Sequence, residues 1–140
     1  MARKIIDSVE LLLRLEKQKM DELRLEIFKA EEQLTLTLHA IKSLNQKITD
    51  ERDLNSIKIE TGQTYSSFSD TSKKKQEAYL IEMNRLKLEY DDLLDKLRDK
   101  FSDTKAYEKA IEQWQLRLKK KEARLEQKVL DDIALRRKSR

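Results

Sequence analysis

The chain has 140 residues, of which 41% are charged and 38% hydrophobic, with one Gly, no Pro and no Cys. This composition is typical of long helices and coiled coils, and the absence of Cys excludes a disulfide framework and thiolate chemistry. No stretch approaches the roughly 20 apolar residues of a membrane span, and the first residues do not resemble a signal peptide. We therefore expect a cytoplasmic protein without a membrane span.

A heptad repeat of apolar residues runs along the first part of the chain. Its positions are Ile6, Val9, Leu13, Glu16, Met20, Leu23, Ile27, Ala30, Leu34, Thr37, Ile41, Leu44 and Ile48. Only Glu16 and Thr37 are polar. A repeat of 3.5 residues forms a narrow stripe, here called the seam, that is buried against a partner helix. The pattern predicts a helix from about residue 3 to 60.

The next part of the frame, from Glu51 to Gln76, is almost entirely polar. Gly62 and many Ser and Thr residues lie here, and Ser and Thr hydrogen-bond to nearby backbone in place of the helical pattern. We expect the chain to reverse at about 61–72. The heptad frame does not slip across the gap, so a continuous helix in a parallel dimer remains an alternative, although its seam would be unsupported here.

The repeat resumes in the second half of the chain and predicts a helix over about 73–137. Its positions are Tyr79, Met83, Leu86, Tyr90, Leu93, Leu97, Lys100, Thr104, Tyr107, Ile111, Trp114, Leu118, Lys121 and Leu125, followed at steps of four by Val129 and Ile133. The predicted fold is all-α, a long antiparallel two-helix coiled-coil hairpin forming a single domain over residues 1–140.

Both ends of the chain are basic. Residues 1–20 hold five cations against three anions, and residues 117–140 hold ten against four, within a total net charge of +4. A hairpin brings these segments together, so we expect one cationic tip. Carboxylates interrupt the basic residues and no aromatic residues lie among them, which favours an acidic protein pocket over nucleic acid as the partner. Binding to nucleic acid or to an anionic membrane stays open as an alternative class.

Several apolar residues of the first helix lie off the seam. We name this set the outward stripe; it consists of Leu11, Leu15, Leu25, Phe28 and Leu36. Exposed apolar stripes mark binding surfaces, so the stripe is a candidate partner contact. His39 has no companion at ligand spacing, and the single Gly excludes a phosphate-binding loop. We expect no catalytic, metal or cofactor residues, and a protein that is not an enzyme.

The C-terminal segment, residues 125–137 (LEQKVLDDIALRR), resembles the ending of the FliJ family. Two further matches lie upstream, at residues 30–34 (AEEQL) and at Tyr65-x-x-Phe68. The resemblance extends over nearly the whole chain. It implies a cytoplasmic component of the flagellar type III export apparatus, peripherally associated with the inner membrane.

The resemblance also implies protein partners. These are an export ATPase ring (FliI-like), an export gate (FlhA-like) and export chaperones. By position, Gln33, Tyr65 and Phe68 match the gate-binding surface, although Thr37, Ala40 and Leu44 depart from the larger residues common in the family. The ATPase ring is expected to contact the basic tip, which comprises Arg3, Lys4, Arg136, Arg137 and Lys138. A stalk protein of a virulence type III system and a generic dimeric scaffold are the alternatives.

Overall fold

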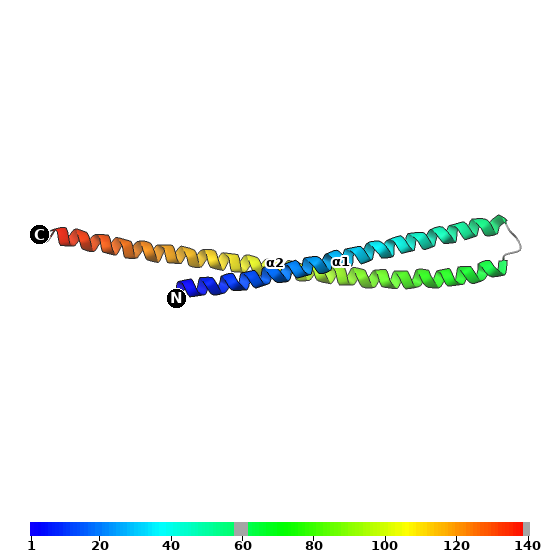
Figure 1. Cartoon of the computed structure of the whole chain (residues 1–140), viewed down its shortest axis with the longest axis horizontal. Coiled ribbons are helices and arrows are strands. Elements are labelled where there is room, and N and C mark those ends of the chain that lie inside the picture. The colour runs from blue at the N-terminus through cyan, green and yellow to red at the C-terminus, as the bar shows by residue number, and fades with distance from the viewer. Residues whose placement is uncertain (58–61, 139–140) are drawn as a thin grey trace. The chain divides into compact units, whose positions relative to one another are not determined.

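The chain is all-α, as predicted, and consists of two long helices that pack against each other (Figure 1). The computed structural model describes residues 1–57 and 62–138, with side chains at 1–54 and 66–138. Helix α1 is Ala2–Ile57 and helix α2 is Gly62–Lys138. The described residues form two compact units, one of Met1–Asp21 with Arg98–Arg140 and one of Glu22–Leu97. Each unit contains a segment of both helices, and the single domain stays a prediction.

In the unit of residues 22–97, the helices pack through an apolar core. Ile27, Ala30 and Leu93 are buried together, with Leu23, Tyr90, Leu94 and Leu97 against them. Two hydrogen bonds cross between the helices: Tyr90 donates its hydroxyl to Glu31 Oε1 at 3.0 Å, and Gln76 Nε2 donates to Asn45 Oδ1 at 2.9 Å. The partner residues rise along α1 as they fall along α2, so the two helices are antiparallel. The hairpin prediction is therefore confirmed.

The unit of residues 1–21 and 98–140 has a more polar seam. Ile6 and Met20 are its buried apolar residues on α1, 7% and 5% exposed. On α2 the buried residue is Thr104, which is 4% exposed and donates its hydroxyl to the Phe101 carbonyl oxygen at 2.7 Å. The hydroxyl is thus satisfied within its own helix, as is common for Ser and Thr in helices.

The heptad frame predicts which side chains face the partner helix. Every seam residue of α1 from Ile6 to Ile48 is buried or half-buried, including the polar Glu16 and Thr37. On α2 the same holds from Tyr79 to Leu118. The frame is wrong for Lys121 and Leu125, which are exposed, because a seam residue is buried only where the other helix accompanies it.

Helix α2 begins earlier in the chain than expected. Helix α2 begins at Gly62, so residues 62–72 are helical and are not the turn that the Ser and Thr content predicted. Thr71 donates its hydroxyl to the Ser67 carbonyl oxygen at 2.9 Å, a bond that keeps the hydroxyl inside the helical pattern. Ser72 is 3% exposed and serves as a small seam residue. Helix α1 ends at Ile57, and Thr61 lies outside the described residues.

Candidate functional site

The last part of α2 has little cover from α1. Every side chain of residues 119–138, which we name the overhang, is exposed. Its apolar residues Leu125, Val129 and Ile133 are 55%, 57% and 47% exposed and continue the seam at steps of four, which place them on one helix face. The overhang therefore presents an apolar stripe where the seam has lost its partner.

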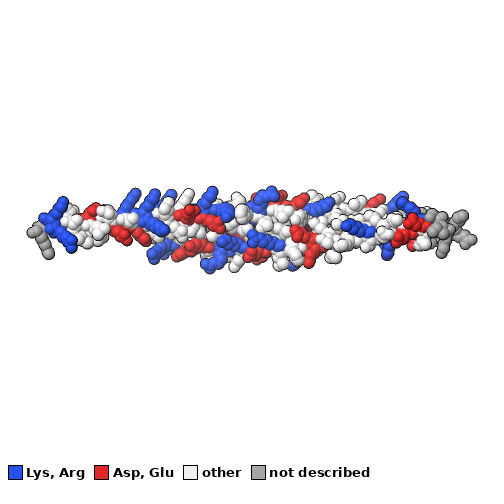
Figure 2. Space-filling view, turned by 90° about the horizontal axis from the view of Figure 1, so that it is seen from above, with Lys and Arg blue, Asp and Glu red and all other residues white. Residues whose placement is uncertain are grey.

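The overhang ends in a cationic turn. Arg136, Arg137 and Lys138 form the basic last turn of α2, and Figure 2 shows Lys and Arg gathered at that end of the helix. Cations are favourable here because the last carbonyl groups of a helix carry partial negative charge. The last turn of α2 combines positive charge with exposure to solvent, as a contact with an acidic protein surface requires.

The two termini do not form the single cationic tip expected from the sequence. Arg3 lines a shallow groove with Leu118, Lys119 and Glu122 of α2. A rise of ~1.5 Å per residue places Arg136 roughly 20 Å further along α2 than Glu122. Arg3 and the adjacent Lys4 are therefore separated from the basic last turn. The reason is the early reversal, which leaves α2 with 77 residues and α1 with 56.

The outward stripe is exposed, as the heptad frame predicts. Leu11 and Leu15 are 52% and 45% exposed in one unit. In the other unit Leu25, Phe28 and Leu36 are 56%, 56% and 68% exposed. Side chains of this size and exposure are available to a partner protein, whose identity the stripe alone does not specify.

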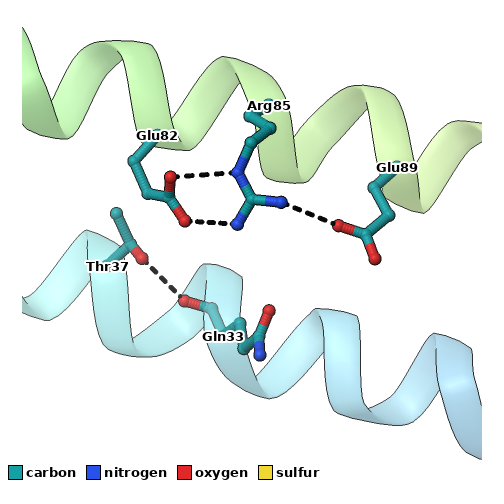
Figure 3. A network of polar contacts seen from close by, with 5 residues as sticks. All are labelled: Gln33, Thr37, Glu82, Arg85 and Glu89. Carbon is teal, nitrogen blue, oxygen red and sulfur yellow. Dashed lines mark hydrogen bonds and ion pairs between the residues drawn. The ribbon is translucent and has the colours of Figure 1, made fainter.

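Gln33 lies on α1 opposite a charged network of α2 (Figure 3). Arg85 donates to both carboxylate oxygens of Glu82, at 3.0 Å and 2.6 Å, and to Glu89 at 3.3 Å. The hydrogen bond from Arg85 lowers the pKa of Glu82, and the same bond raises the pKa of Arg85. Gln33 itself is exposed, and its carbonyl oxygen accepts a bond of 2.9 Å from the Thr37 hydroxyl.

Phe68 occupies a different place in the same unit. It is half-buried and lines a shallow groove built by both helices, together with Ile48, Arg52, Ser69, Ser72, Lys73 and Gln76. Ile48 lies roughly 22 Å from Gln33 along α1 at the helical rise of ~1.5 Å per residue. The structure therefore does not bring Gln33 and Phe68 together. The side chain of Tyr65 lies outside the described residues.

One polar contact was not predicted, although the heptad frame placed both of its residues at seam positions. Lys100 Nζ lies 3.0 Å from Glu16 Oε2, and Lys19 Nζ lies 3.4 Å from Glu16 Oε1. The side chains of Glu16 and Lys100 are 13% and 31% exposed. The Lys100 ammonium is the main cause of the lowered pKa of Glu16, and the Glu16 carboxylate likewise raises the pKa of Lys100. The sequence signal for this contact was a pair of opposite charges at seam positions of the two predicted helices.

The described side chains contain no group of three or more His, Cys, Asp or Glu residues arranged to hold a metal ion. His39 is exposed. Among the described residues, neither helix is both long and apolar enough to cross a membrane. The candidate sites that the described side chains offer are the overhang, the outward stripe, Gln33 and the groove at Phe68.

A family model described as "Flagellar FliJ protein" matches residues 7–140. The match covers almost the whole chain, including the overhang and the groove at Phe68. No curated protein and no solved structure gives a significant match.

Proposed function

This chain belongs to the FliJ family of flagellar proteins, and from that premise we propose that it is a non-enzymatic stalk that links the export ATPase ring to the export gate. In this role it also handles export chaperones, and it is cytoplasmic and associated with the inner membrane only through the export apparatus. The observation that carries the proposal is the overhang, a helix end with exposed apolar and basic side chains and little cover from α1.

The overhang supports the ATPase contact in two ways. Its apolar stripe, from Leu125 to Ile133, loses exposed area when another protein surrounds it, and burial of apolar surface favours binding. Its basic last turn adds electrostatic attraction to an acidic surface, which raises the association rate and selects the partner. Arg3 of α1 lines a groove with Glu122 of α2, so Arg3 and the adjacent Lys4 are separated from the basic last turn. We therefore assign them a secondary part in this contact.

The ATPase contact is tested by reversing the charge of the last turn. In the double variant Arg136→Glu and Arg137→Glu, we expect affinity for the purified export ATPase to fall at least about tenfold. The double variant Lys73→Glu and Lys74→Glu is the matched control, because these are also adjacent exposed cations of α2. Circular dichroism verifies the helix content. Equal affinity of both variants for the ATPase would exclude the last turn from the contact.

The groove at Phe68 supports the gate contact. Its lining includes the apolar side chains of Phe68 and Ile48 and the cationic side chains of Arg52 and Lys73. Phe68 retains partial exposure, so a partner is able to reach its ring. Gln33 and Tyr65 belong to the same proposal through their family positions, with Gln33 as a separate point of contact.

The gate contact is tested with Phe68→Ala against the purified cytoplasmic domain of the export gate. We expect weaker gate binding and unchanged ATPase binding, because the groove and the overhang belong to different units. Phe28→Ala is the control, since Phe28 is an aromatic residue of the outward stripe with 56% exposure. If Phe68→Ala lowers the helix content while gate affinity per folded molecule stays the same, Phe68 is a packing residue only.

The outward stripe supports chaperone handling. Leu25, Phe28 and Leu36 remain exposed although each is large and apolar, which is typical of a surface that a partner covers. Replacing the three with Ser should weaken capture of a purified export chaperone and leave ATPase binding unchanged. Unchanged chaperone capture would remove the stripe from the proposal.

A further inference from the structure

Glu16 and Lys100 form a charged pair inside an otherwise largely apolar seam. They come from different helices, and their 3.0 Å contact joins the buried Oε2 of Glu16 to the Lys100 ammonium. Lys19, from α1, completes the set by contacting the other oxygen at 3.4 Å. We name these three residues the polar layer. Because Glu16 is largely shielded from solvent, removal of its partner on α2 changes the stability of the pairing more than removal of a partner from a surface ion pair would.

The other polar groups near this layer depend less on which residue of the other helix lies opposite them. The Thr104 hydroxyl is bonded to its own helix through the Phe101 carbonyl. The Lys17–Glu108 pair also crosses between the helices, but at 3.9 Å and with side chains 58% and 42% exposed. An exposed pair at this distance contributes little to the choice of partner.

Apolar seam residues specify a register only weakly. A shift of one helix by a heptad places apolar residues opposite apolar residues again, because the pattern repeats every seven positions. The same shift places Glu16 opposite Tyr107, one heptad beyond Lys100 on α2. Glu16 Oε2 then loses the Lys100 ammonium, and Lys19 of its own helix stays in contact with Oε1. A charge that is largely shielded from water and loses its partner on the other helix is unfavourable.

A longer reversal, which such a shift requires, would remove little apolar packing from the seam itself. Beside the seam, the half-buried Phe68 would lose its place in the groove with Ile48. The first described seam positions of α2 are Ser69 and Ser72, which bury almost no apolar surface when they pack. Their loss from the helix would remove little hydrophobic stabilisation. The apolar seam therefore permits a shifted pairing, and the polar layer opposes it.

From this geometry we infer that the Glu16–Lys100 pair specifies the register of α1 against α2 and thereby fixes where the overhang begins. A shift by one heptad changes the length of uncovered α2 by about 10 Å at the rise of ~1.5 Å per residue. The specification of register stands independently of the proposed function. The importance of the overhang length for an ATPase ring rests on that function.

The register is measured by the distance between two spin labels. The chain has no Cys, so Ser8→Cys and Ser102→Cys, at exposed positions of α1 and α2 in the same unit, give one label on each helix. In the otherwise unchanged chain we expect a single distance by pulsed electron paramagnetic resonance. With Glu16→Leu and Lys100→Leu added, we expect a second distance displaced by up to about 10 Å, with the thermal midpoint equal or higher.

Two further variants separate pairing from the mere presence of charge. The exchange Glu16→Lys with Lys100→Glu restores opposite charges and should restore the single distance. The control Lys17→Gln with Glu108→Gln removes the exposed pair and should leave the single distance unchanged. A single unshifted distance in the double Leu variant would overturn the inference, as would multiple distances in the exchange variant. Neither result depends on whether the protein binds an ATPase, which is measured separately.

Discussion

The apolar seam residues of α2 are buried in one part of the helix and exposed in another. Up to Leu118 its side chains are buried or half-buried against α1. Beyond that point Leu125 and Val129 are 55% and 57% exposed. The apolar repeat therefore defines a face of the helix, and the length of the other helix determines whether that face is covered.

The two parts of α2 are also stabilised by different forces. The paired part gains from burial of apolar area, which provides most helix stability in proteins. The overhang depends on local effects: good helix formers such as Leu, Lys, Arg and Glu, a bond of 3.0 Å from Gln127 Nε2 to Asp131 Oδ1, and the basic last turn. We therefore expect the paired part to be sensitive to truncation of its seam residues and the overhang to open readily.

The largest effect is expected for Leu86→Ala in the paired part. Leu86 is 2% exposed, and truncation of such a side chain lowers the free energy of unfolding by about 2–5 kcal/mol. Urea denaturation followed by circular dichroism measures the loss. Leu88→Ala is the matched control on the same helix, because Leu88 is 71% exposed, and should change the free energy by less than about 0.5 kcal/mol. Equal effects would contradict the assigned seam.

The second effect concerns amide hydrogen exchange along α2. Amides of residues 123–138 should exchange at least about tenfold faster than those of residues 86–111, since an unpaired helix opens without unfolding the rest. Mass spectrometry of peptic fragments measures the difference in the isolated protein. Equal protection of the two segments would mean that another copy or segment covers the overhang in solution.

A third, smaller effect is the pH dependence of the polar layer. The folded-state pKa of Glu16 is lowered from 4.5 by the bond from Lys100, with Lys19 contributing. The stabilisation by this carboxylate is therefore present above pH 4.5 and is lost as pH falls through the lowered pKa. The pKa of Lys100 is raised from 10.5, mainly by Glu16 and also by Asp103 and Tyr107, so its contribution is lost as pH rises through that raised pKa.

Thermal midpoints at pH 7 and at pH 3 check the acid side of this dependence. The variant Glu16→Gln should be less stable than the unchanged chain at pH 7, and the difference should narrow at pH 3. A constant difference across this range would show that the carboxylate charge of Glu16 does not stabilise the pairing.

The smallest effect is expected for Arg85→Gln. Arg85 contacts Glu82 and Glu89 on its own helix, and all three side chains are well exposed, at 59%, 45% and 51%. Pairs between neighbouring turns of one helix contribute little and are screened by salt. We expect the urea midpoint to change by no more than the scatter of repeated measurements. A clear fall of the urea midpoint that persists in 0.5 M salt would indicate that the network stabilises the packing of α1 against α2.

The seam was predictable from sequence because burial at every third or fourth residue is a direct consequence of helix geometry. The reversal was less predictable. Ser and Thr have low helix propensity in general, but here Thr71 bonds back to Ser67 and Ser72 fits between the helices. The local hydroxyl bonds and the tertiary packing both favour helix here, so α2 includes this Ser- and Thr-rich segment.

The candidate sites were predictable only in part. The outward stripe follows from the frame, and all of its residues are exposed. The position of the overhang depended on the reversal and was therefore missed, together with the separation of Arg3 from the basic last turn. The pairing of Glu16 with Lys100 requires the register of two helices, which a single sequence with a repeating pattern does not define.

The early reversal also changes the width of the molecule within the unit of residues 1–21 and 98–140. A single helix with its side chains is about 10–12 Å across, and a second helix adds a further ~8–10 Å between axes. The overhang therefore fits an opening that excludes the helix pair. Such an opening admits the overhang of α2 as far as the start of α1, near Arg3 and Leu118. At that level α1 adds its own width and acts as a physical stop.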